Sequence, residues 1–160
     1  MLGRMTQPPA LPYATTRHVH DHCLCLKAQR AARALARRFD AAFRPLGLRN
    51  GQFSLLMALN RPEPPTLGAV AALLAMDRTT LTAALKPLGR RGLVASGADA
   101  ADRRSRRLAL TDAGRALLAE ATAIWRREHA ALDAELTATP PGDLRYTLGL
   151  LASLSASAER

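Results

Sequence analysis

Hydrophobic residues recur at helical spacing in three long segments of the chain. In residues 21–44, small or apolar side chains recur every three or four positions while arginines mostly occupy the other faces, a pattern typical of a long amphipathic helix. A second long helix, capped by Thr111-Asp112, is predicted to run to about Thr137, and a last one follows the Pro140-Pro141-Gly142 break. These terminal regions are too apolar for a small domain that leaves them exposed, so they predict dimerisation.

Shorter elements occupy the middle of the chain. Asn50 opens a helix, and the proline-rich residues 61–65 form a stiff turn. Thr66 and Asp77 each precede a short helix, and their side-chain oxygens are expected to accept backbone N–H groups of the first turn. The second of these helices contains Pro87, which removes one backbone hydrogen bond and predicts a bent or frayed last turn.

Two short alternating runs follow, at residues 93–95 and 106–110, on either side of a small and charged stretch. They predict a β-hairpin. A helix, a turn, a second helix and then a hairpin form the layout of a winged helix-turn-helix, whose second short helix enters the major groove of DNA. The predicted fold class is therefore mainly α with a small β-hairpin wing, a winged helix-turn-helix with long terminal dimerisation helices.

The position of the charged residues along the chain indicates the binding partner. The 160 residues carry a net charge of +10, from 23 Lys and Arg against 13 Asp and Glu. That balance favours an anionic partner such as nucleic acid or a membrane surface, but a GC-rich genome would also produce it, because nearly all the cations are Arg. Residues 86–107 hold seven basic and two acidic side chains, a net charge of +5. This cluster is almost one-signed and centred on the hairpin turn, which favours duplex DNA as the partner.

The predicted DNA contacts fall on the second short helix and on the hairpin. Hydroxyl groups and long cations at a helix N-terminus suit base edges and phosphates, although threonines on a solvated helix face would give the same pattern. Arginines of a hairpin tip can enter a narrow minor groove while their neighbours pair with flanking phosphates. The candidate DNA-binding residues are Arg78, Thr79, Thr80, Thr82, Lys86, Asp102, Arg103, Arg104 and Arg106.

Other classes of site have little support in the sequence. Two cysteines are too few for a disulfide framework, which fits a reducing cytoplasm, and the longest apolar stretch, residues 67–76, is too short to cross a bilayer. Paired carboxylates, a Gly-framed serine and a Cys-x-x-Cys motif are missing. We therefore expect no enzyme, no cofactor and no membrane partner. No metal site is expected either, since Cys23, Cys25 and His22 would need converging side chains to bind one.

Three segments carry a more specific pattern. The first reads Asp102-x-Arg104-x-x-x-Leu108-x-Leu110-Thr111-x-x-Gly114, and the others read Leu48-x-x-x-Gln52-Phe53-x-x-Leu56 and Leu88-x-x-x-Gly92-Leu93-Val94. Together they resemble the multiple-antibiotic-resistance regulator (MarR) family of bacterial winged-helix repressors, and the first looks like the wing signature of that family followed by its next helix. The resemblance covers about residues 21–154.

The resemblance implies a homodimeric regulator, a repressor in the usual case, that reads a pseudo-palindromic operator in double-stranded DNA and is released by a small-molecule effector. Arg104 would be the minor-groove residue of the wing, and Asp102 would orient it. With the unpatterned, proline-containing N-terminus, the expected organisation is a flexible arm at 1–16 and one domain at 17–160, divided into dimerisation helices at 17–47 and 112–158 and the winged helix-turn-helix at 48–111. Two-fold symmetry predicts half-sites about 10 bp apart.

Two alternatives remain open for the switch. Cys23 and Cys25 lie at the start of the first predicted helix, where the helix N-terminus and a protonated His favour the reactive thiolate. The peroxide-sensing branch of the family is similar in carrying its reactive cysteine there, and Cys25 looks like that position, although cysteines packed in a dimer interface are the commoner interpretation. The other alternative is an effector crevice, with candidate lining residues Arg37, Phe39, Phe43 and Trp125, each of which could instead be a core or interface residue.

Two further functions would use the same residues. A nonspecific DNA-binding protein would use the arginines without preferring an operator, and a peroxide-reducing thiol enzyme would use Cys25. Competition between specific and bulk DNA distinguishes the first from a repressor, and turnover with a recycling thiol would reveal the second.

Overall fold

The computed structural model of the chain describes residues 10–99 and 106–156. The chain divides into two compact units, Met1–Arg38 and Phe39–Arg160, which we describe separately. No single helix of the described residues is long and apolar enough to span a membrane; one pair of consecutive helices, residues 67–73 and 78–90, reaches that length and composition together, with a bend of 104° between them.

The first unit contains helix α1 (Tyr13–His22) and most of helix α2 (Leu24–Phe43). The break between them falls at Cys23, whose backbone is extended (φ −70°, ψ 109°). The sequence predicted one helix starting near residue 21 and an arm over residues 1–16. In the structure, helix begins inside the expected arm, directly after Pro12, whose fixed φ suits a helix start. Residues 1–9 of the predicted arm lie outside the described residues.

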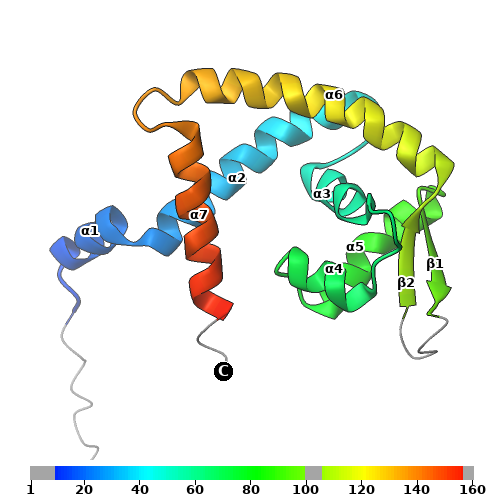
Figure 1. The fold of residues 1–160 in the computed structure, drawn as a ribbon. Helices are drawn as coiled ribbons and strands as arrows, with labels where there is room; N and C mark the ends of the chain where they lie inside the picture. Colours follow the sequence, from blue (N-terminus) through cyan, green and yellow to red (C-terminus); the bar gives the residue numbers. More distant parts are fainter. Residues whose placement is uncertain (1–9, 100–105, 157–160) are drawn as a thin grey trace, which may run out of the picture. The chain divides into compact units, whose positions relative to one another are not determined.

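The second unit begins with the end of α2 and has the predicted order of helices and strands (Figure 1). The elements are the 3-10 helix η1 (Arg44–Leu46), α3 (Asn50–Leu59), α4 (Leu67–Leu73), α5 (Arg78–Arg90), β1 (Val94–Ala98), β2 (Arg106–Leu110), α6 (Asp112–Glu135) and α7 (Pro141–Ala156). The strands form an antiparallel hairpin that pairs Val94 with Leu110 and Ala98 with Arg106. The first strand begins one residue later than the predicted run and ends three residues later, at Ala98.

Side-chain caps start three of these helices, as the sequence predicted. Thr66 Oγ1 accepts the Ala69 N–H at 3.2 Å at the start of α4, and Asp77 Oδ1 accepts the Thr80 N–H at 2.8 Å at the start of α5. Thr111 caps α6 in the same way. Each cap satisfies a backbone donor that a first helical turn leaves unpaired, so these polar residues fix the helix starts locally.

The end of α5 is closed despite the proline inside it. The Arg91 N–H donates to the Pro87 carbonyl at 3.1 Å, and the Leu93 N–H donates to the Leu88 carbonyl at 3.0 Å. Gly92 has φ +66°, the left-handed conformation that commonly ends a helix. The predicted fraying is therefore wrong, because a glycine-terminated hydrogen-bond pattern compensates for the bond that Pro87 cannot make.

The core of the second unit lies where α3, α5, α6 and the hairpin meet. Phe43, Leu56, Leu81 and Leu88 are fully buried there. The rings of Phe43 and Phe53 stack with centroids 4.8 Å apart, which anchors the end of α2 on α3. This packing holds the two short helices and the hairpin as one body.

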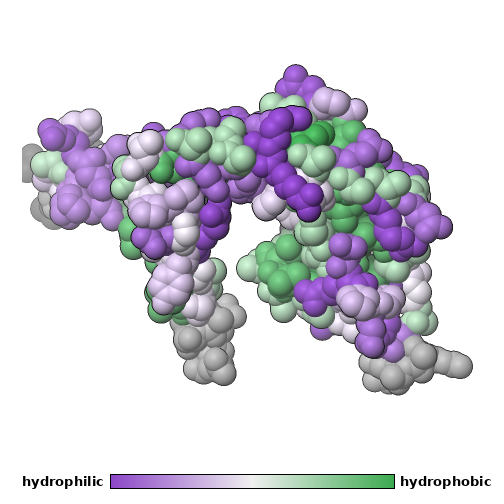
Figure 2. Space-filling view, turned by 45° about the horizontal axis from the view of Figure 1, so that its top comes forward, coloured by the Kyte–Doolittle hydropathy of each residue, from purple (hydrophilic) through white to green (hydrophobic). Residues whose placement is uncertain are grey.

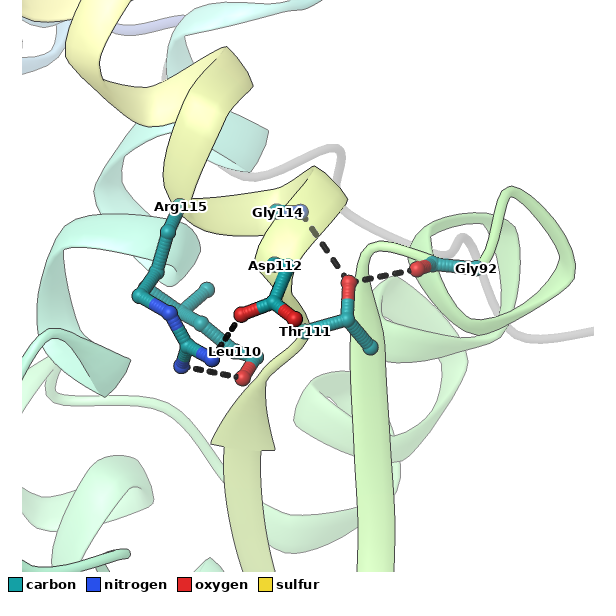
Figure 3. A network of polar contacts seen from close by, with 6 residues as sticks. All are labelled: Gly92, Leu110, Thr111, Asp112, Gly114 and Arg115. Atoms are coloured by element: carbon teal, nitrogen blue, oxygen red, sulfur yellow. Dashed lines mark hydrogen bonds and ion pairs between the residues drawn. The ribbon is translucent and has the colours of Figure 1, made fainter.

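Thr111 joins the end of α5 to the start of α6 (Figure 3). Its hydroxyl donates to the Gly92 carbonyl at 2.6 Å and accepts the Gly114 N–H at 3.0 Å, while its own N–H donates to the Leu93 carbonyl at 3.1 Å. Gly114 is buried and so close to Leu93 that a Cβ at this position would lie closer than 3.0 Å to the Leu93 carbonyl oxygen. Only glycine permits this approach.

Helix α7 is joined to α6 by an ion pair between Arg145 and Asp133, with Nη2 to Oδ1 and Oδ2 distances of 2.6 and 2.7 Å. This hydrogen bond lowers the pKa of Asp133 and raises the pKa of Arg145. Helix α7 also exposes several large hydrophobic side chains, which are Tyr146, Leu148, Leu150, Leu151 and Leu154.

Candidate nucleic-acid interface

All five candidate DNA-binding residues of α5 lie on its exposed surface. Leu81 and Leu88 turn toward the core, whereas the candidate residues are exposed: they are Arg78, Thr79, Thr80, Thr82 and Lys86. The buried positions hold α5 in place, and the opposite positions are available to a ligand.

Two of the threonine hydroxyls already have partners within the helix. Thr80 Oγ1 donates to Asp77 Oδ2 at 2.6 Å, and Thr82 Oγ1 donates to the Arg78 carbonyl at 2.7 Å. Each oxygen keeps acceptor capacity, and the methyl groups can make apolar contacts. The hydrogen bonds from Thr80 lower the pKa of Asp77. The stabilisation from this cap is therefore present above the ordinary pKa of an Asp carboxyl and is lost as the pH falls through the lowered value.

A groove of about 210 Å³ joins α5 to the hairpin. Thr82 and Lys86 line it from α5, and Arg106 lines it from β2. Apolar side chains that include Leu85 and Leu108 form its floor. Residues that are 24 positions apart in the sequence, Thr82 and Arg106, thus border one surface feature, which sequence spacing alone does not show.

Arg106 is the one candidate wing residue within the described part of the hairpin. Its Nε donates to Ser96 Oγ at 2.8 Å across the two strands, which orients the guanidinium along the exposed face. Asp102, Arg103 and Arg104 lie outside the described residues. The roles of Asp102 and Arg104 remain what the resemblance implies, and the contact of Arg103 with DNA remains a prediction.

Two arginines of the basic cluster have partners inside the protein, which the sequence did not reveal. Arg91 donates from Nη1 to the Gly47 carbonyl at 2.7 Å and from Nη2 to the Leu46 carbonyl at 3.2 Å. Arg107 forms an ion pair with Asp99 and donates to the Pro64 carbonyl. The backbone partners of Arg91 lie 44 and 45 positions away in the sequence, and the backbone partner of Arg107 lies 43 positions away. No local pattern could therefore have distinguished these two arginines from phosphate-binding ones.

A second and larger pocket, of about 590 Å³, lies between α3, the end of α4 and α6. Phe53, Met57 and Leu73 form part of its apolar wall, and Arg61 and Arg126 border it. Figure 2 shows hydrophobic surface near the end of α4, where Leu73 is exposed. The spacing of Thr122, Trp125 and Arg126, which places them on one helical face, is a signal that could have indicated this wall.

The four candidate residues of the effector crevice have different environments in the structure. Trp125 lines the pocket and is 36% exposed. Phe39 and Phe43 belong to the buried core, as the alternative interpretation expected. Arg37 is exposed and belongs to the first unit.

The two cysteines lie at the start of α2, as predicted. Cys23 directly precedes α2, and its Sγ accepts the Leu26 N–H at 3.4 Å. Cys25 is exposed, and both thiols are free. Within the described residues no three His, Cys, Asp or Glu side chains are grouped so that they could hold a metal ion.

Comparison with known families and structures identifies relatives of this arrangement. A family model described as "MarR family" matches residues 46–105, the segment from η1 to the hairpin. No curated protein sequence matches the chain. The similarity to solved structures, in contrast, extends over most of it.

The transcriptional regulator MosR of Mycobacterium tuberculosis, solved in complex with DNA, is 36% identical with a TM-score of 0.78, over 87% of this chain and all 100% of that one. The transcriptional repressor CouR, bound to a 23-mer DNA duplex, is 30% identical with a TM-score of 0.66, over 89% and 96%. A regulator from Bordetella bronchiseptica, BpsR, whose DNA binding is regulated by 6-hydroxynicotinic acid, is 25% identical with a TM-score of 0.70, over 84% and 94%.

Proposed function

Because the chain belongs to the MarR family of transcriptional regulators, we propose that α5 and the hairpin wing form the surface with which it binds an operator in double-stranded DNA. The observation that carries this proposal is the groove bordered by Thr82 and Lys86 of α5 and by Arg106 of the wing. The protein acts as a homodimeric repressor in the cytoplasm, and a small-molecule effector releases it from the operator.

The chemistry of the α5 surface supports this assignment. Phosphate contacts need exposed cations, which Arg78, Lys86 and Arg106 supply. Base edges need short side chains near a helix N-terminus that can enter the major groove, which Thr79 and Thr82 supply. Arg104 would extend the contact into the minor groove, as the resemblance implies, and Arg103 would pair with a flanking phosphate.

Exposed apolar faces support the homodimer. Tyr146 and Leu154 of α7 are 69% and 67% exposed, and Leu24 of α2 is 67% exposed. Apolar faces of this kind on both terminal helical regions mark an interaction surface, and a two-fold symmetric dimer would cover them. The dimer then presents two copies of α5 to the DNA.

A selection experiment tests operator recognition. Wild-type protein is used to enrich binding sequences from a pool of randomised DNA duplexes. We expect a pseudo-palindrome whose half-sites are about 10 bp apart centre to centre. The selected duplex should be bound at least about 1,000-fold more tightly than bulk DNA at physiological salt. Equal affinity for all duplexes at every salt concentration would contradict the proposal and indicate a nonspecific DNA-binding protein.

The pocket beside Trp125 is the proposed effector site. An apolar wall with two arginines at its border suits a small aromatic anion, because the ring can pack on Trp125 while the charge pairs with Arg61 or Arg126. A ligand that binds here contacts α3, which packs against α5, and this offers a route for release from DNA.

Trp125 is the only tryptophan of the chain, so its fluorescence reports on this pocket. We expect salicylate, as a probe aromatic anion, to quench the fluorescence, and Arg126→Gln to weaken that binding about tenfold through loss of a charge-assisted contact. Arg127→Gln is the matched control, because Arg127 is exposed and does not line the pocket. Equal salicylate affinities for both variants and the wild type would remove Arg126 from the site.

The cysteines support a second candidate, a repressor switched by peroxide. The Cys23 sulfur accepts a backbone N–H at the start of α2. Cys25, two residues further along the chain, is exposed, and both thiols are free. An exposed, free thiol is accessible to peroxide, which oxidises cysteine to a sulfenic acid.

Alkylation mapping with an organic peroxide tests this second candidate. Peroxide should block alkylation of Cys25 and lower the affinity for the selected duplex, and Cys25→Ser should abolish both effects. Cys23→Ser is the companion variant and distinguishes which thiol reacts. Unchanged operator affinity after complete oxidation of Cys25 would leave effector binding as the switch.

A further inference from the structure

Arg107 lies next to Arg106 in β2, but its side chain is held by the protein. Its Nε lies 2.9 Å from Asp99 Oδ2, and its Nη1 donates to the Pro64 carbonyl at 2.8 Å. One guanidinium therefore connects the end of the first wing strand to the proline-rich turn before α4. Because the guanidinium is planar and has several fixed donors, it can hold two partners at once.

Asp99 is the buried member of this contact. The Asp99 side chain is 8% exposed, against 40% for Arg107. A carboxylate buried to this extent is costly unless it is paired and hydrogen-bonded. The pairing with Arg107 therefore helps to hold Asp99 in place directly after β1.

The backbone beside Arg107 makes the same connection. Arg107 forms a β-bridge with Thr66, and the Leu108 N–H donates to the Pro65 carbonyl at 2.9 Å. Residue 66 also caps α4. The Arg107 side chain is therefore the outer part of a connection between the wing and the first helix of the helix-turn-helix.

We propose that Arg107 is a positioning residue for DNA binding: by holding Asp99 and the Pro64 carbonyl, it sets the direction of the wing relative to α4 and α5. Its charge is used inside the protein and contributes no phosphate contact. The inference rests on the proposed function, since it concerns how the wing is presented to DNA.

The two roles of Arg107 predict opposite effects of a change at Asp99. If Arg107 contacted phosphate, Asp99→Asn would remove a negative charge near the DNA and strengthen binding. If Arg107 positions the wing, Asp99→Asn weakens the connection, and we expect operator affinity to fall by about tenfold, the effect of losing one charge-assisted hydrogen bond.

The experiment measures the affinity of full-length wild type, Asp99→Asn, Arg107→Ala and the double variant for the selected duplex over a range of salt concentrations. Both single variants should lose affinity, the double variant should lose no more than Arg107→Ala, and the slope of log affinity against log salt should stay at the wild-type value. Arg106→Ala is the matched control, and its slope should fall by about one unit because one phosphate contact is lost. Arg107→Lys, which can keep one of the two partners, should recover part of the affinity.

Each outcome decides one question. Tighter binding by Asp99→Asn, or a salt slope reduced by one unit in Arg107→Ala, would overturn the positioning role while leaving operator binding intact. A wild-type protein without sequence preference would instead overturn the proposed function. Circular dichroism checks the fold of every variant; if Arg107→Ala is unfolded, the sign of the change in Asp99→Asn and the partial recovery in Arg107→Lys still decide the matter.

Discussion

Replacing Gly114 by alanine is expected to lower the free energy of unfolding by about 3 kcal/mol or more, the upper range for overpacking a rigid site. The added Cβ would collide with the Leu93 carbonyl oxygen, which is backbone and also accepts the Thr111 N–H. Relief requires α6 to move away from the end of α5, which breaks the hydrogen bonds that Thr111 donates to the Gly92 and Leu93 carbonyls. Thermal or urea unfolding followed by circular dichroism measures the loss.

Gly51→Ala is the matched control for this prediction. Gly51 lies in the first turn of α3, is exposed, and has no atom within 4 Å of a Cβ placed on it. Alanine there should be neutral or stabilise the protein by up to about 1 kcal/mol, because it favours helix over glycine. Similar effects of the two substitutions would show that the Leu93 contact does not constrain the junction.

The double substitution Lys86→Ala and Arg106→Ala is expected to reduce affinity for the selected operator by about 100-fold at fixed salt, because two charge-assisted phosphate contacts are lost. The salt slope should fall by about two units. Both side chains border the groove between α5 and the wing, and neither is buried, so the fold should be retained. Fluorescence anisotropy of a labelled duplex at several salt concentrations measures both quantities.

Arg127→Ala serves as the control for charge alone, since Arg127 is an exposed cation on α6 outside the groove. It should change affinity little and leave the slope within error of the wild type. If Arg127→Ala and each of the groove substitutions had equal effects, the attraction would come from overall charge, and the groove would have no special role.

Much of the fold followed from local rules in the sequence. Thr66, Asp77 and Thr111 begin helices because their side chains satisfy the first backbone N–H groups within three residues. The alternating run at 106–110 forms β2 as predicted. Local rules failed at the N-terminus, where helix begins at Tyr13 and breaks at Cys23, and at Pro87, where Gly92 and its hydrogen bonds offset the lost donor.

The candidate site was predicted only as a set of residues. The sequence predicted Thr82 and Lys86 as DNA contacts of the second short helix, and the structure shows that both are exposed on α5. Their contact with DNA remains a prediction. Sequence spacing could not show that Arg106 borders the same groove, because that depends on how the hairpin folds back on α5.

The sequence by itself determined the order of elements, the helix caps and the concentration of positive charge between residues 86 and 107, because these depend on neighbours a few positions away. Only the tertiary structure decided how that charge is used. Arg106 remains at the groove, whereas Arg91 and Arg107 hold backbone carbonyls 43 to 45 positions away. The physical reason is that a guanidinium pairs with whatever acceptor the fold brings to it, and chain neighbours do not specify that acceptor.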